Sequence, residues 1–156
     1  MPIEYKVGDL LEAREPYIAQ GCNAQGVMGS GVAKVWRKKW PDSYEDYHNE
    51  FKTNGLFLGQ VVFHHTSKFP QPVLCNCITQ DFYGRDGGPY VSYDAVRSCM
   101  KELQKMAAGQ AIAMPKIGAG LGGGDWNIIS EIIEEEIKGP VVVYVLNESE
   151  IPDEQT

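Results

Sequence analysis

The sequence predicts an α/β sandwich built on a largely parallel or mixed sheet, and three observations point to it. Short apolar runs alternate along the chain with longer segments in which apolar residues recur at helical spacing. Some runs, such as VVVYVL at 141–146, are apolar throughout, which is typical of strands covered on both faces. Two glycine-rich segments each follow a predicted strand and precede a predicted helix. Ligands of such sheets bind beyond the carboxyl ends of the strands, so both segments lie where a ligand is expected.

The predicted strands are the short apolar runs. In chain order they cover residues 3–7, 17–22, 60–66, 73–79, 111–115 and 141–146. The predicted helices, where apolar positions lie three and four residues apart, cover residues 32–39, 42–54, 92–108 and 125–137. In the last helix the apolar positions form one stripe, made of Trp126, Ile129, Ile132 and Ile133. Glutamates cover much of the remaining surface of that helix, so we expect the stripe to face the core.

Length, charge and hydropathy narrow the class of protein. The 156 residues fit one domain over residues 1–147, followed by an acidic tail at 148–156. The formal net charge of -7 disfavours binding of nucleic acid through neutralisation of its phosphates. No apolar run reaches membrane-spanning length, and the first residues lack the order of a signal peptide. We therefore expect a cytoplasmic protein with no membrane partner, and a monomer.

The four cysteines do not have the spacing of zinc ligands. Cys75 and Cys77 alternate along a predicted strand and therefore point to one face, which favours buried free thiols. The sequence accordingly predicts neither a metal nor a cofactor.

The glycine-rich segments are CNAQGVMGSG at 22–31 and IGAGLGGG at 117–124. Glycine lets the backbone approach a ligand closely, and the first N–H groups of the following helix lack partners, so each segment can cradle an anion. Two such loops at one edge of a sheet predict two neighbouring phosphates, hence a diphosphate. Gly118, Gly120 and Gly123 also fit the dinucleotide fingerprint G-x-G-x-x-G, but too little chain follows for a Rossmann domain. A P-loop is excluded because the sequence has no G-K-[ST].

Asp9 follows the first predicted strand, in the segment VGDLLE. Its carboxylate can accept hydrogen bonds from an adenine amino group, or it can cap the turn that follows. On the residues alone, the cap is the more common use.

Three segments together resemble a macrodomain, the ADP-ribose-binding fold. They are VGDLLEA near the start, IAQGCNAQGVMGSGVAKVWRKKWPDSYEDYH after it, and MPKIGAGLGGGDW late in the chain. The resemblance runs in order from about residue 3 to residue 147. It is strongest to the branch with the ADP-ribose-1''-phosphate phosphatases, the terminal ADP-ribose protein glycohydrolase and the DNA ADP-ribosyl glycohydrolases. The resemblance implies a three-layer α/β/α sandwich with a central mixed sheet, and ADP-ribose or ADP-ribose 1''-phosphate in a surface cleft.

The resemblance also implies roles for individual residues. Asp9 would meet the adenine amino group, and Leu10 would flank the adenine. Asn23 would approach the distal ribose, which Tyr83 could also line. The first phosphate loop would comprise Gly29, Ser30, Gly31 and Val32. The second would comprise Gly118, Ala119, Gly120, Leu121, Gly122 and Gly123.

Departures from the family pattern bear on the activity. Family members that remove mono-ADP-ribose often carry an aspartate where this chain has Ala33. Other hydrolases of the branch use a lysine near the position of Gln80 and Asp81. What remains favours hydrolysis of ADP-ribose 1''-phosphate to ADP-ribose and phosphate, or binding with no chemistry. For the phosphatase the candidate catalytic residues are Asp125, Asp81 and Asn23, although Asp125 is equally suited to cap the last predicted helix.

Three functions therefore stay open. The leading one is the phosphatase. The second is an ADP-ribosyl hydrolase acting on a modified protein or nucleic acid, or on O-acetyl-ADP-ribose, and only there do we expect a nucleic-acid partner. The third is a reader that binds ADP-ribose without chemistry.

Overall fold

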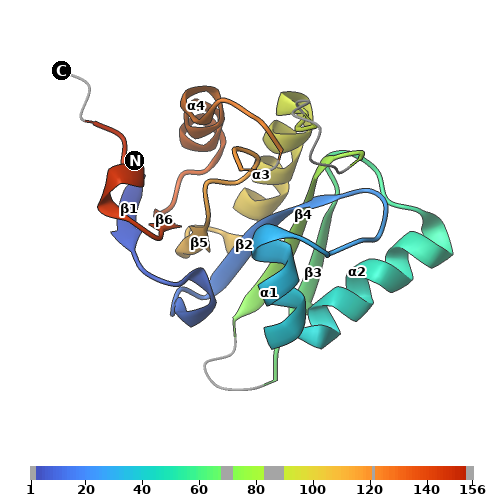
Figure 1. Ribbon diagram of the computed structural model, residues 1–156. Helices are drawn as coiled ribbons and strands as arrows, with labels where there is room; N and C mark the ends of the chain where they lie inside the picture. The colour runs from blue at the N-terminus through green and yellow to red at the C-terminus, as the bar shows by residue number, and fades with distance from the viewer. Residues whose placement is uncertain (1–2, 68–71, 83–89, 121, 154–156) are drawn as a thin grey trace.

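The computed structural model describes residues 3–67, 72–82, 90–120 and 122–153. These residues form a six-stranded sheet in the order β1-β6-β5-β2-β4-β3 (Figure 1). The strands are β1 (Glu4–Val7), β2 (Tyr17–Asn23), β3 (Val61–His65), β4 (Val73–Gln80), β5 (Ile112–Met114) and β6 (Val141–Val145). Every predicted strand is present, with ends close to the predicted ones.

Pairing in the sheet is mixed. The strands β1, β6, β5, β2 and β4 run parallel to their neighbours, and β3 pairs antiparallel with β4 at the edge. The run Val141–Val145 is buried at every position, as expected for a strand covered on both faces. Because parallel strands end at one edge of the sheet, the segments that follow β2, β4 and β5 are neighbours.

Helices cover both faces of the sheet, which confirms the three-layer α/β/α sandwich (Figure 1). On one face lie α1 (Gly31–Lys39) and α2 (Pro41–Asn54), and on the other lie α3 (Tyr93–Ala107) and α4 (Trp126–Glu136). Two short 3-10 turns, η1 (Leu10–Glu12) and η2 (Glu148–Glu150), complete the described elements. They are absent from the sequence prediction because three residues are too few to show a period.

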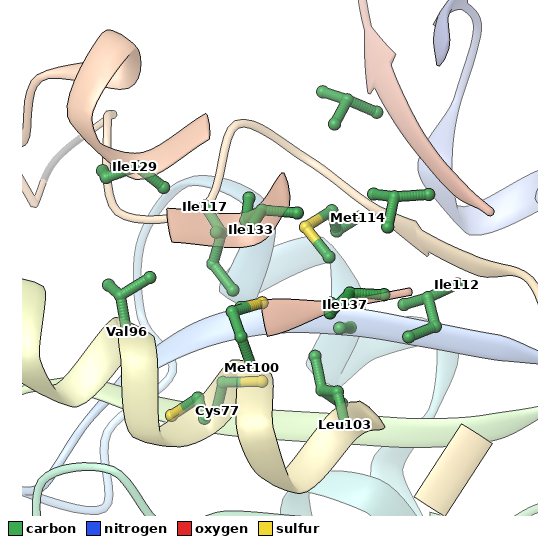
Figure 2. Packing of buried hydrophobic residues seen from close by; sticks show 14 of the residues in the cluster. Cys77, Val96, Met100, Leu103, Ile112, Met114, Ile117, Ile129, Ile133 and Ile137 are labelled. Carbon is green, nitrogen blue, oxygen red and sulfur yellow. The ribbon is translucent and has the colours of Figure 1, made fainter. Parts of the chain in front are cut away.

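The larger core lies between the sheet and the helices α3 and α4 (Figure 2). Met100 and Leu103 of α3 are fully buried there, with Met114 of β5. The predicted stripe of α4 is also buried in this cluster, with Ile129 and Ile133 wholly so. The stripe of α4 is therefore confirmed as core.

The cysteine prediction is confirmed as well. Cys75 and Cys77 are fully buried free thiols in the same cluster, facing α3. Among the residues that the structure describes, no group of three or more His, Cys, Asp and Glu side chains is arranged to hold a metal. No helix in the described ranges has the length and apolar character needed to traverse a bilayer.

Candidate functional site

A cavity of about 720 Å³ opens at the carboxyl ends of the parallel strands β5, β2 and β4. It is bounded by the loop from β2 to α1 (residues 24–30), called the first loop, and by the loop from β5 to α4 (residues 115–125), called the second loop. Both glycine-rich segments of the sequence thus meet at one cavity, as their positions after parallel strands predict.

Asn23 shapes the first loop from inside. Its Oδ1 accepts hydrogen bonds from the backbone N–H of Gln25 (2.9 Å) and the hydroxyl of Tyr47 (2.9 Å). Its Nδ2 donates to the carbonyl of Val27 (2.9 Å). The hydroxyl of Tyr47 also lies 2.6 Å from the carbonyl oxygen of Asn23. Burial raises the pKa of Tyr47, so this hydroxyl keeps its proton and remains a donor.

The first loop ends on an open helix N-terminus. Ser30 takes the N-cap position of α1 in an extended conformation, and its side chain makes no capping hydrogen bond. Gly31 has φ +58°, a conformation that favours glycine. The N–H groups of Gly31, Val32 and Ala33 belong to the first turn, where an α-helix offers no internal acceptor. All three residues line the cavity, so the positive end of the α1 dipole faces it.

The other described helices that follow loops are capped differently. Ser92 accepts a hydrogen bond from the N–H of Ala95 at the start of α3, and Asp125 accepts one from Asn127 at the start of α4. Helix α2, which follows α1 directly, has no side-chain cap either. Of the described helices that begin at a loop, α1 is therefore the one whose first turn lacks a capping side chain, and this turn lines the cavity.

Close packing fixes the second loop. Its N–H groups of Gly124 and Gly123 donate to the carbonyls of Gly118 (2.9 Å) and Gly120 (3.1 Å). A Cβ on Gly118, which has φ +78°, would stand 2.8 Å from the side chain of Val91. A Cβ on Gly122 would stand 2.8 Å from the carbonyl oxygen of Gly118. Gly118, Gly120 and Gly122 line the cavity, so glycine serves the compact shape of the loop as well as access to a ligand.

A register shift in the sheet lies at the floor of the cavity. Cys22 pairs with Ile78, but the next residue, Asn23, pairs with Gln80, so Thr79 is an extra residue in β4. The hydroxyl oxygen of Thr79 is buried and has no hydrogen-bond partner among the described residues. Gly21 lies beside it, because a Cβ there would be 3.0 Å from that oxygen.

A second unpaired oxygen belongs to Gln20. Asn76 donates through Nδ2 to the carbonyl of Ser43 (3.2 Å), which fixes its amide orientation because a carbonyl can only accept. Asn76 Oδ1 therefore accepts from Gln20 Nε2 (3.0 Å). This leaves Gln20 Oε1 buried and without a partner in the described parts of the chain. Gln20 and Thr79 both contribute to the lining of the cavity, although these two oxygens are themselves buried.

The cavity is nearly free of charge. Lys116 is the one charged side chain among the described residues that line it. Cys22 also lines it, but burial raises the pKa of this thiol, which keeps it protonated and unsuited as a nucleophile.

The structure brings together eight of the residues that the sequence singles out for the site. These cavity-lining residues are Asn23, Gly29, Ser30, Gly31, Val32, Gly118, Gly120 and Gly122. Sequence reasoning missed Gln20, Thr79 and Lys116. A polar Gln20 inside an apolar strand, and a lysine between a strand and a glycine loop, were signals available in the sequence.

Other predicted residues do not line this cavity. Ala119 and Gly123 belong to the second loop but are absent from the lining of the cavity, and Leu10, the first residue of η1, is buried in the core. The carboxylate of Asp9 accepts from the N–H of Leu11 (2.9 Å), which makes it the cap of η1. Tyr83 and Leu121 lie outside the described residues.

Asp81 and Asp125, the two carboxylates predicted to be catalytic, do not line the cavity either. Asp125 Oδ1 accepts from the N–H of Asn127 (2.9 Å), so it serves as the cap of α4. Asp81 directly follows Gln80, which does line the cavity, and its carbonyl accepts from the N–H of Ala24 (3.2 Å). Their catalytic roles stay predictions.

Comparison with known proteins identifies a protein family for this chain. The family model described as Macro domain matches residues 19–133. The chain is 32% identical to an ADP-ribose 1''-phosphate phosphatase of Candida albicans, over 92% of this chain and 99% of that protein. It is 26% identical to a DNA ADP-ribosyl glycohydrolase of Thermus aquaticus, over 93% of this chain but only 41% of that longer protein.

Solved structures agree with these relatives. A Bacteroides thetaiotaomicron protein of unknown function superimposes with a TM-score of 0.83 at 33% identity, covering 92% of this chain and 98% of that one. The macrodomain of Thermus aquaticus DarG superimposes with a TM-score of 0.77 at 25% identity, covering 91% of this chain and 96% of that one.

Proposed function

The chain belongs to the macrodomain family, and on that basis we propose that its cavity binds ADP-ribose and that the protein hydrolyses ADP-ribose 1''-phosphate. One observation carries the proposal: the first turn of α1 and three glycines of the second loop, Gly118, Gly120 and Gly122, line a single cavity. A diphosphate needs donors on both sides, and neutral backbone N–H groups supply them without a basic surface.

The strand order gives the ligand a direction. Asp9 follows β1, at one edge of the sheet, whereas Asn23 and Gln80 end β2 and β4 toward the other edge. With adenine near Asp9, the diphosphate would lie over β5 and β2, and the distal ribose would reach Asn23. The second carboxylate oxygen of Asp9 would accept from the adenine amino group while Oδ1 caps η1.

In the proposed reaction, water attacks the phosphorus of the 1''-phosphate. The bond from phosphorus to the oxygen on C1'' breaks, and this oxygen takes up a proton to give ADP-ribose and inorganic phosphate. Backbone donors would hold the diphosphate and fix the substrate against Asn23. Asp81 is better placed than Asp125 to move the proton, because it adjoins a cavity residue while Asp125 caps α4.

The test is phosphate release from ADP-ribose 1''-phosphate by the unchanged chain and by Asp81→Asn and Asp125→Asn. We expect release by the unchanged chain and a loss of about a hundredfold in kcat for Asp81→Asn, the usual scale of general acid-base catalysis. Asp125→Asn should retain activity, because asparagine also caps helices. Binding of ADP-ribose without phosphate release would overturn the phosphatase and leave a reader or another hydrolase.

A second candidate is removal of ADP-ribose from a modified macromolecule. It is favoured by the similarity to the Thermus aquaticus glycohydrolase along 93% of this chain. Incubation with ADP-ribosylated DNA and ADP-ribosylated protein distinguishes the two, since this activity releases ADP-ribose from the polymer and the phosphatase does not.

A further inference from the structure

Lys116 is the one charged side chain that the described residues contribute to the cavity. It stands just beyond β5, two residues before Gly118, and it is half-buried. The N–H of Ala119 donates to its carbonyl (3.1 Å), so its backbone belongs to the folded part of the second loop. The same turn that shapes the glycine loop therefore fixes the backbone of Lys116.

The ammonium group of Lys116 has no hydrogen bond or ion pair recorded within the described ranges. Some lysines elsewhere on the surface are paired. Lys39 contacts the carbonyl of Leu11 and lies 3.3 Å from the carboxylate of Glu12. Lys138 donates to the carbonyl of Glu135 (2.7 Å). A protein with a formal net charge of -7 has many carboxylates to pair with a lysine, yet none in the described part of the chain pairs with Lys116.

The strand order places this charge on one side of the cavity. β5 lies between β6 and β2, whereas β4 lies beyond β2. Lys116 follows β5, so it stands on the side of β1 and Asp9, and Gln80 ends β4 on the opposite side. In the binding direction proposed above, the adenosine diphosphate half of the ligand lies next to Lys116 and the reacting end lies away from it.

We infer that Lys116 pairs with the diphosphate of the bound nucleotide and sets the affinity of the cavity for anionic ligands, without taking part in the reaction at the distal end. This inference rests on the proposed binding of ADP-ribose. A diphosphate carries two negative charges, and the backbone donors of α1 and the second loop are neutral. Among the described residues of the lining, the ammonium group of Lys116 therefore supplies the one full positive charge against it.

Two properties follow from this arrangement. The affinity for ADP-ribose should fall as salt is added, because the pairing is partly exposed to solvent and is screened. The loss of affinity on removing the charge should be equal for ADP-ribose and for ADP-ribose 1''-phosphate, because the two ligands share the diphosphate and differ only at the far end.

The test compares Lys116→Met and Lys116→Arg with the unchanged chain, and uses Lys101→Met as control. Lys101 is an exposed residue on α3, away from the cavity lining, so its replacement changes the net charge equally. Calorimetric titration with ADP-ribose and ADP-ribose 1''-phosphate at two salt concentrations gives the affinities. Phosphate release gives kcat and KM.

For Lys116→Met we expect an affinity about tenfold weaker for both ligands, the scale of one hydrogen bond to a charged group, with a smaller salt dependence. KM should rise by a similar factor while kcat stays within about twofold, and Lys116→Arg should recover most of the affinity because it retains the charge. Lys101→Met should match the unchanged chain.

Three results would overturn the inference. One is unchanged affinity in Lys116→Met, and another is an equal loss in Lys101→Met. The third is a loss confined to ADP-ribose 1''-phosphate with a fall in kcat, which would place the lysine at the reacting phosphate. Failure of the unchanged chain to bind ADP-ribose is a different outcome, because it would remove the proposed function itself.

Discussion

Replacement of Asn23 by alanine tests whether this side chain holds the first loop in shape. The change removes three hydrogen bonds of 2.9 Å, to the N–H of Gln25, the carbonyl of Val27 and the hydroxyl of Tyr47. Each such bond contributes about 1 kcal/mol net. The hydroxyl of Tyr47 keeps its second acceptor, the carbonyl of residue 23, at 2.6 Å, which reduces the loss. We therefore expect a decrease of about 2–3 kcal/mol in the free energy of unfolding.

Urea denaturation of Asn23→Ala gives this quantity, and calorimetry gives the affinity for ADP-ribose of the folded variant. Tyr47→Phe is the matched variant, because it removes only the hydroxyl at the other end of one bond. In the double variant the two losses should be less than additive, since Asn23 and Tyr47 share that bond. Full additivity, or an Asn23→Ala protein as stable as the unchanged chain, would refute the role of Asn23 in the loop.

Two further predictions concern packing and buried thiols. Gly122→Ala should lower the free energy of unfolding by about 1–3 kcal/mol and weaken ADP-ribose binding, because its Cβ would stand 2.8 Å from the carbonyl oxygen of Gly118. Gly120→Ala, whose Cβ meets nothing within 4 Å, should unfold like the unchanged chain in urea, and equal losses in both variants would contradict the packing account. Burial raises the pKa of Cys22 and Cys75 above the ordinary value of 9.0, so unfolded thiols ionise first as pH rises. Each buried thiol should therefore lower the free energy of unfolding by about 1.4 kcal/mol between pH 8 and pH 10. In urea titrations across that range, the free energy of unfolding of Cys75→Ala should fall less steeply than that of the unchanged chain. A fall as steep as that of the unchanged chain would refute this assignment.

The fold could be predicted from the sequence because a strand that is buried on both faces must be apolar at nearly every position. A run such as Val141–Val145 has to be apolar at every position when helices cover both sides of its strand. The stripe of α4 carries the same information at helical spacing, in Ile129 and Ile133. The place of the two glycine loops followed from the rule that parallel strands end at one edge.

The details of the site depend on contacts that no local pattern encodes. One hydrogen bond of Asn23 requires Tyr47, a residue of α2 that lies 24 positions later in the chain. The unpaired hydroxyl of Thr79 depends on a register shift between β2 and β4, and strand propensity does not reveal register. Asp125 lies beside a glycine loop in sequence, yet its carboxylate turns to the N–H of Asn127. Proximity along the chain therefore identified the loops but not the direction of their side chains.

The most direct test of the account follows the backbone amide signals of the protein by NMR while ADP-ribose is added. Binding in the proposed cavity predicts the largest shifts at Gly31 and Val32 of α1 and at Gly118 and Gly120 of the second loop, which line the cavity from both sides. Amides of the opposite edge of the sheet, such as those of His64 and His65 at the end of β3, should stay unchanged. The absence of shifts at millimolar ADP-ribose, or shifts centred on His64 and His65, would contradict the central claim that these two loops hold a diphosphate.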